Sequence, residues 1–150
     1  MKPKLLVSAC LLGENCKYSG GNNYNPAIEA LREYYDLVAV CPEQLGGLPT
    51  PRTPSKRVGG KVLTRDGRDV TEAFFAGAAE TLAIAQSAGV SLALFQPRSP
   101  SCGCGQIYDG TFSGKLIPGK GVTTELLEQN GIKIYTDTQI DELVSRKGER

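Results

Sequence analysis

The stretch Val90-Ser-Leu-Ala-Leu-Phe-Gln-Pro-Arg-Ser-Pro-Ser-Cys-Gly-Cys-Gly105 decides how the rest of the chain is interpreted. Its first part, up to Phe95, is short, apolar and rich in β-prone residues, which predicts a buried strand. Two prolines then end any helix or strand ladder, and two glycines allow the backbone to turn tightly. The segment 96–105 is therefore predicted to be an ordered loop that carries serines, an arginine and two thiols at the end of a strand.

The segment before this strand has strong signals for a helix. Asp69 and Glu72 have the spacing of a capping box, and Gly89 supplies a C-terminal stop. The apolar stripe between them consists of Phe74, Ala78, Leu82 and Ala85. A helix that leads directly into a buried strand is typical of a βαβ unit.

The remaining elements repeat this alternation. Apolar runs predict strands over 5–8, 37–40 and 132–135, and helical spacing predicts helices over 26–35, 123–130 and 138–146. Residues 44–60 read as a loop, with a small hairpin or edge strand near 61–64. We expect a single domain over 1–150 of the α/β class: a three-layer α/β/α Rossmann-like sandwich whose mostly parallel sheet has about four main strands in the order 2-1-3-4. Ligands of such sheets bind beyond the C-terminal strand ends, at the switch point of the strand order.

Charge and hydropathy restrict the partners. Seventeen basic and sixteen acidic residues give a net charge of +1, so no global field attracts nucleic acid or a membrane surface. The apolar runs are shorter than the ~20 residues of a membrane span, and the apolar N-terminal run is too short for a signal peptide. A cytoplasmic protein with no nucleic-acid or membrane partner is expected.

The counts of histidine and cysteine restrict the chemistry. The chain has no histidine, which excludes every Ser-His or Cys-His nucleophile pair and the commonest zinc ligand. It has five cysteines, an odd number that argues against a disulfide framework. The remaining roles for the cysteines are metal binding, thiol chemistry or simple burial as apolar side chains.

Three cysteines follow three separate strands of the predicted sheet. Cys10, Cys41 and Cys102 each lie just beyond a strand end, so their thiols are expected to meet at one edge. Burial as small apolar side chains is the ordinary alternative for any one of them. Structural zinc sites favour close cysteine pairs, and Cys102 with Cys104 is the only such pair, whereas an iron–sulfur cluster tolerates scattered thiolate ligands. Cys16 and Cys104 are outside this scheme, as spare thiols or redox partners.

Polar side chains near the three cysteines are candidates for catalysis and substrate binding. Glu43 follows Cys41 by two residues and is a candidate general acid or base, with a loop salt bridge as the alternative. Ser99 and Ser101 are candidates for orienting a substrate or relaying a proton, with turn chemistry as the alternative. Arg52 offers a fork of donors for a carbonyl or phosphate oxygen, with surface solvation as the alternative.

Several motifs resemble a known family. The segments 8–13 (Ser-Ala-Cys-Leu-Leu-Gly), 41–43 (Cys-Pro-Glu) with 46–52, and 99–103 (Ser-Pro-Ser-Cys-Gly) with 110–114 resemble the thiouracil desulfidases, a bacterial family long classified as a domain of unknown function. The resemblance covers nearly the whole chain in the same order.

The resemblance implies a cofactor and a reaction. In that family three cysteines hold a [4Fe-4S] cluster, and the matching positions here are Cys10, Cys41 and Cys102. Glu43 matches the acid–base glutamate and Ser99 the assisting serine. By this similarity a thiocarbonyl sulfur binds the open iron, and water replaces it at carbon without net redox change.

Three functions are therefore to be compared. The first is a cluster-dependent, non-redox desulfidase that releases sulfide from a thiolated pyrimidine or a similar small thiocarbonyl compound. The second is a non-catalytic metal- or cluster-binding protein with a structural or sensing role, which predicts bound metal but no sulfide release. The third is a thiol redox module of Cys102 and Cys104, whose one-residue spacing strains an internal disulfide.

Overall fold

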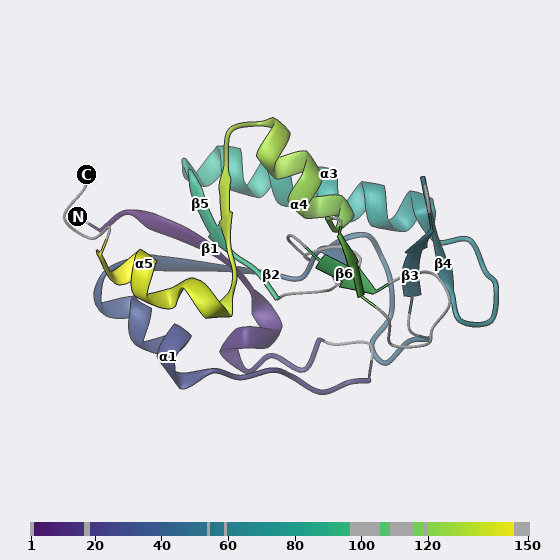
Figure 1. Ribbon diagram of the computed structural model, residues 1–150, viewed down its shortest axis with the longest axis horizontal. Helices are drawn as coiled ribbons and strands as arrows, with labels where there is room; N and C mark the ends of the chain where they lie inside the picture. Colours follow the sequence, from purple (N-terminus) through teal and green to yellow (C-terminus); the bar gives the residue numbers. More distant parts are fainter. Residues whose placement is uncertain are drawn as a thin grey trace.

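A four-stranded parallel sheet forms the centre of the protein (Figure 1). The computed structural model describes residues 2–16, 19–53, 55–58, 60–96, 106–108, 116–118 and 120–145, with 106–108 and 116–118 described by their backbone. The strands are β1 (Lys4–Ser8), β2 (Asp36–Val40), β5 (Leu92–Leu94) and β8 (Lys133–Tyr135). Their order is β2-β1-β5-β8, which confirms the predicted order 2-1-3-4.

The central strand β1 is apolar on both faces. Leu5 and Val7 belong to one core cluster and Leu6 to another, and all three are fully buried. A continuous apolar run of this kind is what a parallel strand needs when helices cover both faces of its sheet.

Helices cover the two faces of the sheet as two layers (Figure 1). One layer contains η1 (Ala9–Leu12), α1 (Pro26–Glu29), η2 (Ala30–Glu33), η3 (Asp137–Gln139) and α5 (Ile140–Ser145). The other contains α3 (Thr71–Ala88) and α4 (Val122–Gln129), which pack on the opposite face. The predicted three-layer α/β/α sandwich is confirmed.

Two predicted helices differ in detail. The helix predicted over 26–35 is the short α-helix α1 continued by the 3-10 helix η2, and this helical segment begins from the Asn25 cap, whose side chain accepts the Ala27 N–H at 3.0 Å. Helix α3 begins at Thr71, and Asp69 lies just before the helix, where its carboxylate accepts the Thr71 N–H at 2.9 Å. Asp69 therefore supports the helix start without forming the predicted capping box.

The prediction of a loop over 44–60 is wrong in part. Residues Pro42–Leu45 form helix α2, and Ser55–Val58 form strand β3, which pairs antiparallel with β4 (Lys61–Thr64). Strand β3 has no apolar alternation, so its own sequence does not predict it; the partner β4, with Val62 fully buried, provides the apolar anchor. Two further short strands, β6 (Gln106–Tyr108) and β7 (Leu116–Pro118), pair antiparallel with each other.

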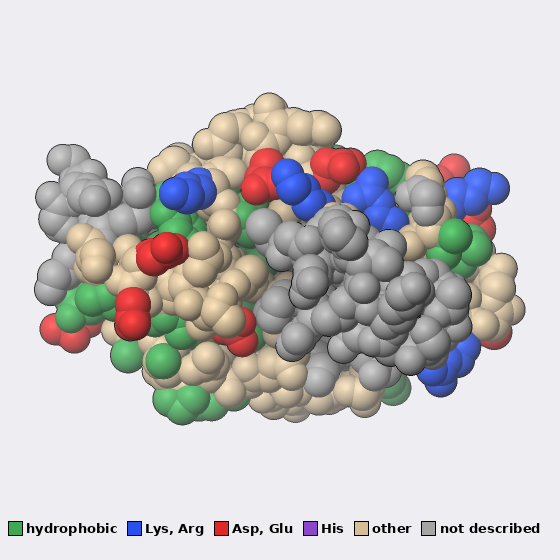
Figure 2. Space-filling model, viewed as in Figure 1, with side chains coloured by type: hydrophobic (Ala, Val, Ile, Leu, Met, Phe, Trp, Pro, Cys, Tyr) green, Lys and Arg blue, Asp and Glu red, His purple; other side chains and the backbone are tan. Residues whose placement is uncertain are grey.

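Charges of both signs share the surface. Figure 2 shows acidic side chains beside basic ones along the upper part of the visible face, in agreement with the near-neutral net charge. Among the described residues, no helix has the length and apolar character that crossing a membrane requires.

Candidate functional site

The first strand positions Cys10 at the C-terminal end of the sheet. Strand β1 ends at Ser8, and the short helix η1 places Cys10 two residues further on, almost fully buried. The returning chain then fixes it, because Asn23 donates its backbone N–H to the Cys10 carbonyl at 2.8 Å and its side-chain amide to Cys10 Sγ at 3.9 Å. Gly13, with a φ of +95°, provides the left-handed residue that ends η1.

The neighbouring strand positions Cys41 and Glu43 at the same end. Strand β2 pairs in register with β1 through Ser8 and Val40, so Cys41 leaves the sheet beside η1. Cys41 is extended, with φ −126° and ψ 99°, and Pro42 begins helix α2 with the φ that a first helical residue needs. Glu43 therefore lies in the first turn of α2.

Two glycines fix helix α2 against helix α3. A Cβ atom on Gly46 would lie 2.0 Å from the Ala73 carbonyl oxygen, and one on Gly77 would lie 1.9 Å from the Pro42 carbonyl oxygen. Real Cβ atoms do not approach so closely, hence the backbones of α2 and α3 are in direct contact at a place where only glycine fits. This contact determines where Cys41 and Glu43 stand relative to the sheet.

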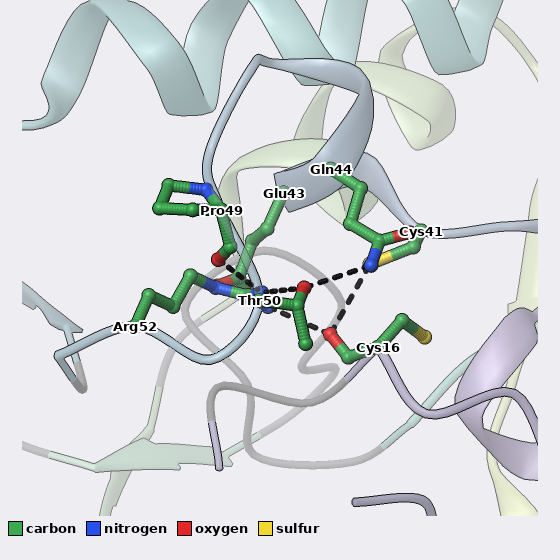
Figure 3. Close-up of polar contacts among 7 residues, drawn as sticks. All are labelled: Cys16, Cys41, Glu43, Gln44, Pro49, Thr50 and Arg52. Atoms are coloured by element: carbon green, nitrogen blue, oxygen red, sulfur yellow. Dashed lines mark hydrogen bonds and ion pairs between the residues drawn. The ribbon is translucent and has the colours of Figure 1, made fainter. Parts of the chain in front are cut away.

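The Glu43 carboxylate forms an ion pair with Arg52 (Figure 3). The Arg52 Nε atom lies 3.0 Å from Glu43 Oε1, and the exposed fractions of the two side chains are 7% for Arg52 and 18% for Glu43. Burial raises the pKa of Glu43 above its ordinary value, while the charge and hydrogen bond of Arg52 oppose this rise. Glu43 is thus a carboxylate held in one place by Arg52, with a pKa above that of an exposed glutamate.

Cys16 joins the site from the loop that follows Cys10. Its thiol is buried, and its carbonyl oxygen accepts hydrogen bonds from Arg52 Nη2 at 2.9 Å and from Cys41 Sγ at 3.7 Å (Figure 3). The side-chain hydrogen bond with Cys10 raises the pKa of the Cys16 thiol to about 11, while the one with Cys41 lowers it. The hydrogen bond with Cys16, followed by burial, raises the pKa of the Cys41 thiol as well.

The sequence pattern leaves Cys16 outside the predicted site, whereas the structure places its thiol between those of Cys10 and Cys41. The signal was present, since Cys16 follows Cys10 by six residues in the same loop. What brings Cys16 back to Cys41 is the fold of that loop and its hydrogen bonds, which spacing alone does not reveal.

The structure brings together four of the predicted site residues. Cys10, Cys41, Glu43 and Arg52 lie at one edge of the sheet, linked through Cys16. The segment after β5 starts at this edge too, because Gln96 donates its backbone N–H to Ser8 Oγ at 2.8 Å. The other predicted site residues lie outside the described residues: Ser99, Ser101 and Cys102, and with them Cys104.

The donor set of this edge fits a thiolate-bound metal cluster. Cys10 and Cys41 are free thiols on neighbouring strand ends, and the nearby carboxylate Glu43 is already paired with Arg52. Within the described part of the chain no group of three His, Cys, Asp or Glu side chains is arranged to hold a single metal ion. The thiols of Cys10 and Cys41, with Cys102 as the third ligand predicted, match the soft donors of iron–sulfur clusters. Ligation requires loss of the thiol protons.

Comparison with known proteins adds independent findings. A family model described as 2-thiouracil desulfurase matches residues 5–139. The protein YbbK of Bacillus subtilis (strain 168) is 41% identical over 150 residues, which cover 93% of this chain and 99% of YbbK.

A solved structure is similar over the full chain. It is described as the [4Fe-4S]-dependent thiouracil desulfidase TudS, and it superposes with a TM-score of 0.93 at 41% sequence identity. The similarity covers 99% of this chain and 100% of that one.

Proposed function

Because the chain belongs to the 2-thiouracil desulfurase family, we propose that it is a desulfidase that converts a thiolated pyrimidine such as 2-thiouracil to its oxo form and releases sulfide. The resemblance inferred from the motifs is confirmed by the family match, and an enzyme is the function class of that family. The observation that carries the proposal is the meeting of two free thiols, Cys10 and Cys41, with the carboxyl group of Glu43 at one sheet edge.

A [4Fe-4S] cluster is the cofactor of this reaction in our proposal, with Cys10, Cys41 and Cys102 as ligands. The similar structure of TudS, described as [4Fe-4S]-dependent, supports the cofactor. The free state of Cys10 and Cys41 on adjacent strand ends supports the first two ligands. When bound through three cysteines, such a cluster supplies one iron without a protein ligand, a Lewis acid with affinity for sulfur.

The chain's own residues transfer the proton in this reaction. The overall change replaces C=S by C=O, consuming one water and releasing one hydrogen sulfide, so it balances without an electron donor. Glu43 is the base and acid at this edge: its Oε1 is held by Arg52, and its Oε2 accepts the proton of the attacking water and returns it to the leaving sulfur. Ser99 assists by hydrogen bonding to the substrate, and Ser101 remains a predicted substrate contact.

The first experiment tests the cluster. Protein reconstituted anaerobically with iron and sulfide is expected to bind a cluster in the wild type and to lose it in Cys10→Ala, Cys41→Ala and Cys102→Ala. Cys104→Ala is the matched control, because it removes a thiol without removing an assigned ligand. Equal iron and equal absorbance in the wild type and all ligand variants would overturn the ligand assignment.

The second experiment tests the reaction. Reconstituted wild type is expected to release sulfide from 2-thiouracil, and Glu43→Gln is expected to keep its iron while losing about 10²–10⁴-fold in kcat. A protein that binds iron yet releases no sulfide from a panel of thiolated bases and nucleosides is instead the non-catalytic cluster-binding protein. Sulfide release that is indifferent to Glu43→Gln would exclude the acid–base role.

We also propose a cytoplasmic location. The chain has five cysteines, an odd number that argues against a disulfide framework, and cysteines without such a framework are typical of the reducing cytosol.

A further inference from the structure

The guanidinium group of Arg52 is almost fully used by the protein itself. An arginine side chain carries five N–H donors. Its Nε donates to Glu43 Oε1, its Nη1 to the Pro49 carbonyl at 3.1 Å and to Thr50 Oγ1 at 2.9 Å, and its Nη2 to the Cys16 carbonyl at 2.9 Å. Only 7% of the side chain is exposed. This pattern is typical of a residue that holds neighbouring segments in place. It is less suited to a residue that binds a substrate.

The partners of Arg52 come from three separate segments. Glu43 belongs to α2, Pro49 and Thr50 to the loop after it, and Cys16 to the loop that begins with Cys10 (Figure 3). The loop after α2 is tightened once more, because Gln44 Nε2 donates to Thr50 Oγ1 at 2.8 Å. Arg52 thus connects the segment that carries Cys10 with the segment that carries Cys41 and Glu43.

The Glu43 carboxylate has two different oxygens as a result. Oε1 is fixed by Arg52, and among the described residues none donates a hydrogen bond to Oε2. A carboxylate anchored by one oxygen presents the other in a fixed direction. Fixed placement matters for proton transfer, which requires heavy atoms within about 2.6–3.2 Å.

We propose that Arg52 is a positioning residue that aims Oε2 of Glu43 at the reacting atoms, in place of the substrate contact that its sequence context predicts. The inference rests on the proposed function, in which Glu43 moves the proton. It predicts that the effect of Arg52 passes through Glu43 and appears in kcat, since an arginine that binds substrate equally in the ground and transition states affects KM.

The test is a kinetic double-mutant cycle on reconstituted protein with 2-thiouracil. Arg52→Lys keeps the charge but loses the fork of donors, and it is expected to lower kcat by about 10²-fold with KM unchanged. In the Glu43→Gln background the same substitution is expected to cause no further loss, because the oxygen that it positions no longer moves a proton. Arg57→Lys is the matched control: Arg57 also binds a glutamate and a backbone carbonyl, and its variant is expected to keep the wild-type kcat.

Further measurements separate the explanations. Iron content and absorbance are measured for every variant. Loss of iron in Arg52→Lys would mean that Arg52 holds the loops that carry the cluster ligands, and this would overturn its role in positioning Glu43. A raised KM that persists in the Glu43→Gln background, or an additive loss of kcat, would overturn it as well. An iron-replete wild type without sulfide release overturns the proposed function itself.

A second variant covers the case in which Arg52→Lys does not fold. Thr50→Val removes the Oγ1 acceptor that Arg52 shares with Gln44 and leaves the Glu43 side chain in place, and it is expected to lower kcat less than Arg52→Lys does, again with KM unchanged. A Thr50→Val enzyme with wild-type kcat would contradict the role of this hydrogen-bonded loop in holding Arg52.

Discussion

Arg52 and Arg57 lie five residues apart in the sequence, and each binds a glutamate at 3.0 Å, but the two regions differ in their surroundings. The Glu43–Arg52 pair has exposed side-chain fractions of 18% and 7%. The Arg57–Glu125 pair, which links β3 to α4, has fractions of 16% and 46%, so its carboxylate side chain is about half exposed to water. An arginine–glutamate ion pair is therefore part of the candidate site in one region. In the other region it is a contact at the protein surface.

The segments that carry the two ion pairs are also attached to the rest of the protein in different ways. Helix α2, which carries Glu43, contacts α3 through glycine backbones and cannot shift sideways without a clash. The β3–β4 hairpin, which carries Arg57, is attached to the body through the buried Val62 side chain and through the Val62 N–H, which Thr71 Oγ1 accepts at 2.9 Å. A precisely positioned carboxylate needs a direct backbone contact such as that between α2 and α3. A peripheral hairpin does not need such support.

The largest effect is expected where the glycine contact is broken. Gly77→Ala places a Cβ atom 1.9 Å from the Pro42 carbonyl oxygen, and because both sides of the clash are backbone, neither can rotate away. We expect a loss of about 3 kcal/mol in the free energy of unfolding, at the upper end of overpacking costs. Urea denaturation measures it.

The matched control for Gly77 is in the other region. Gly60 lies next to β4, and a Cβ atom there would meet nothing within 4 Å, so Gly60→Ala is expected to change stability by less than about 0.5 kcal/mol. Equal stabilities of the two variants would mean that α2 and α3 separate at little cost, and the proposed rigid support of Glu43 would be lost.

The next effect compares the two arginines directly. Arg52→Gln leaves a largely buried carboxylate without its cation and three acceptors with weaker partners, so we expect a loss of about 2 kcal/mol in the free energy of unfolding. Arg57→Gln breaks a pair whose glutamate is half in water, for which less than about 1 kcal/mol is expected. The comparison fails if the Arg57 variant is destabilised as much as the Arg52 variant in urea denaturation.

The sheet and its edge could be predicted from the sequence because their signals are local. Apolar runs define the strands, and the carboxyl ends of parallel strands meet at one edge, so the sequence predicts the neighbouring positions of Cys10 and Cys41 without any tertiary information. The position of Cys102 beside them remains a prediction, since that residue lies outside the described part of the chain.

The contacts that hold the site could not be predicted in this way. Arg52 reaches Cys16 across 36 residues of sequence, through loops without periodicity. Gly77 lies inside a helix, where a glycine usually costs stability, and only the packed structure shows the carbonyl that excludes any larger residue. Strand β3 likewise exists because β4 is beside it.

The smallest effect is expected where the hairpin region joins α3. The hydrogen bonds from Thr71 lower the pKa of Asp69, so the folded state favours the ionised carboxylate. The stabilisation is therefore complete above the unfolded pKa of an aspartate and is lost as the pH falls through the lower folded value. Asp69→Asn is expected to remove this part of the acid dependence, which urea denaturation at several acid pH values measures. Since Asp69 is exposed, the change is smaller than either arginine effect, and an acid dependence identical in wild type and variant would show that this helix start contributes nothing to holding the hairpin.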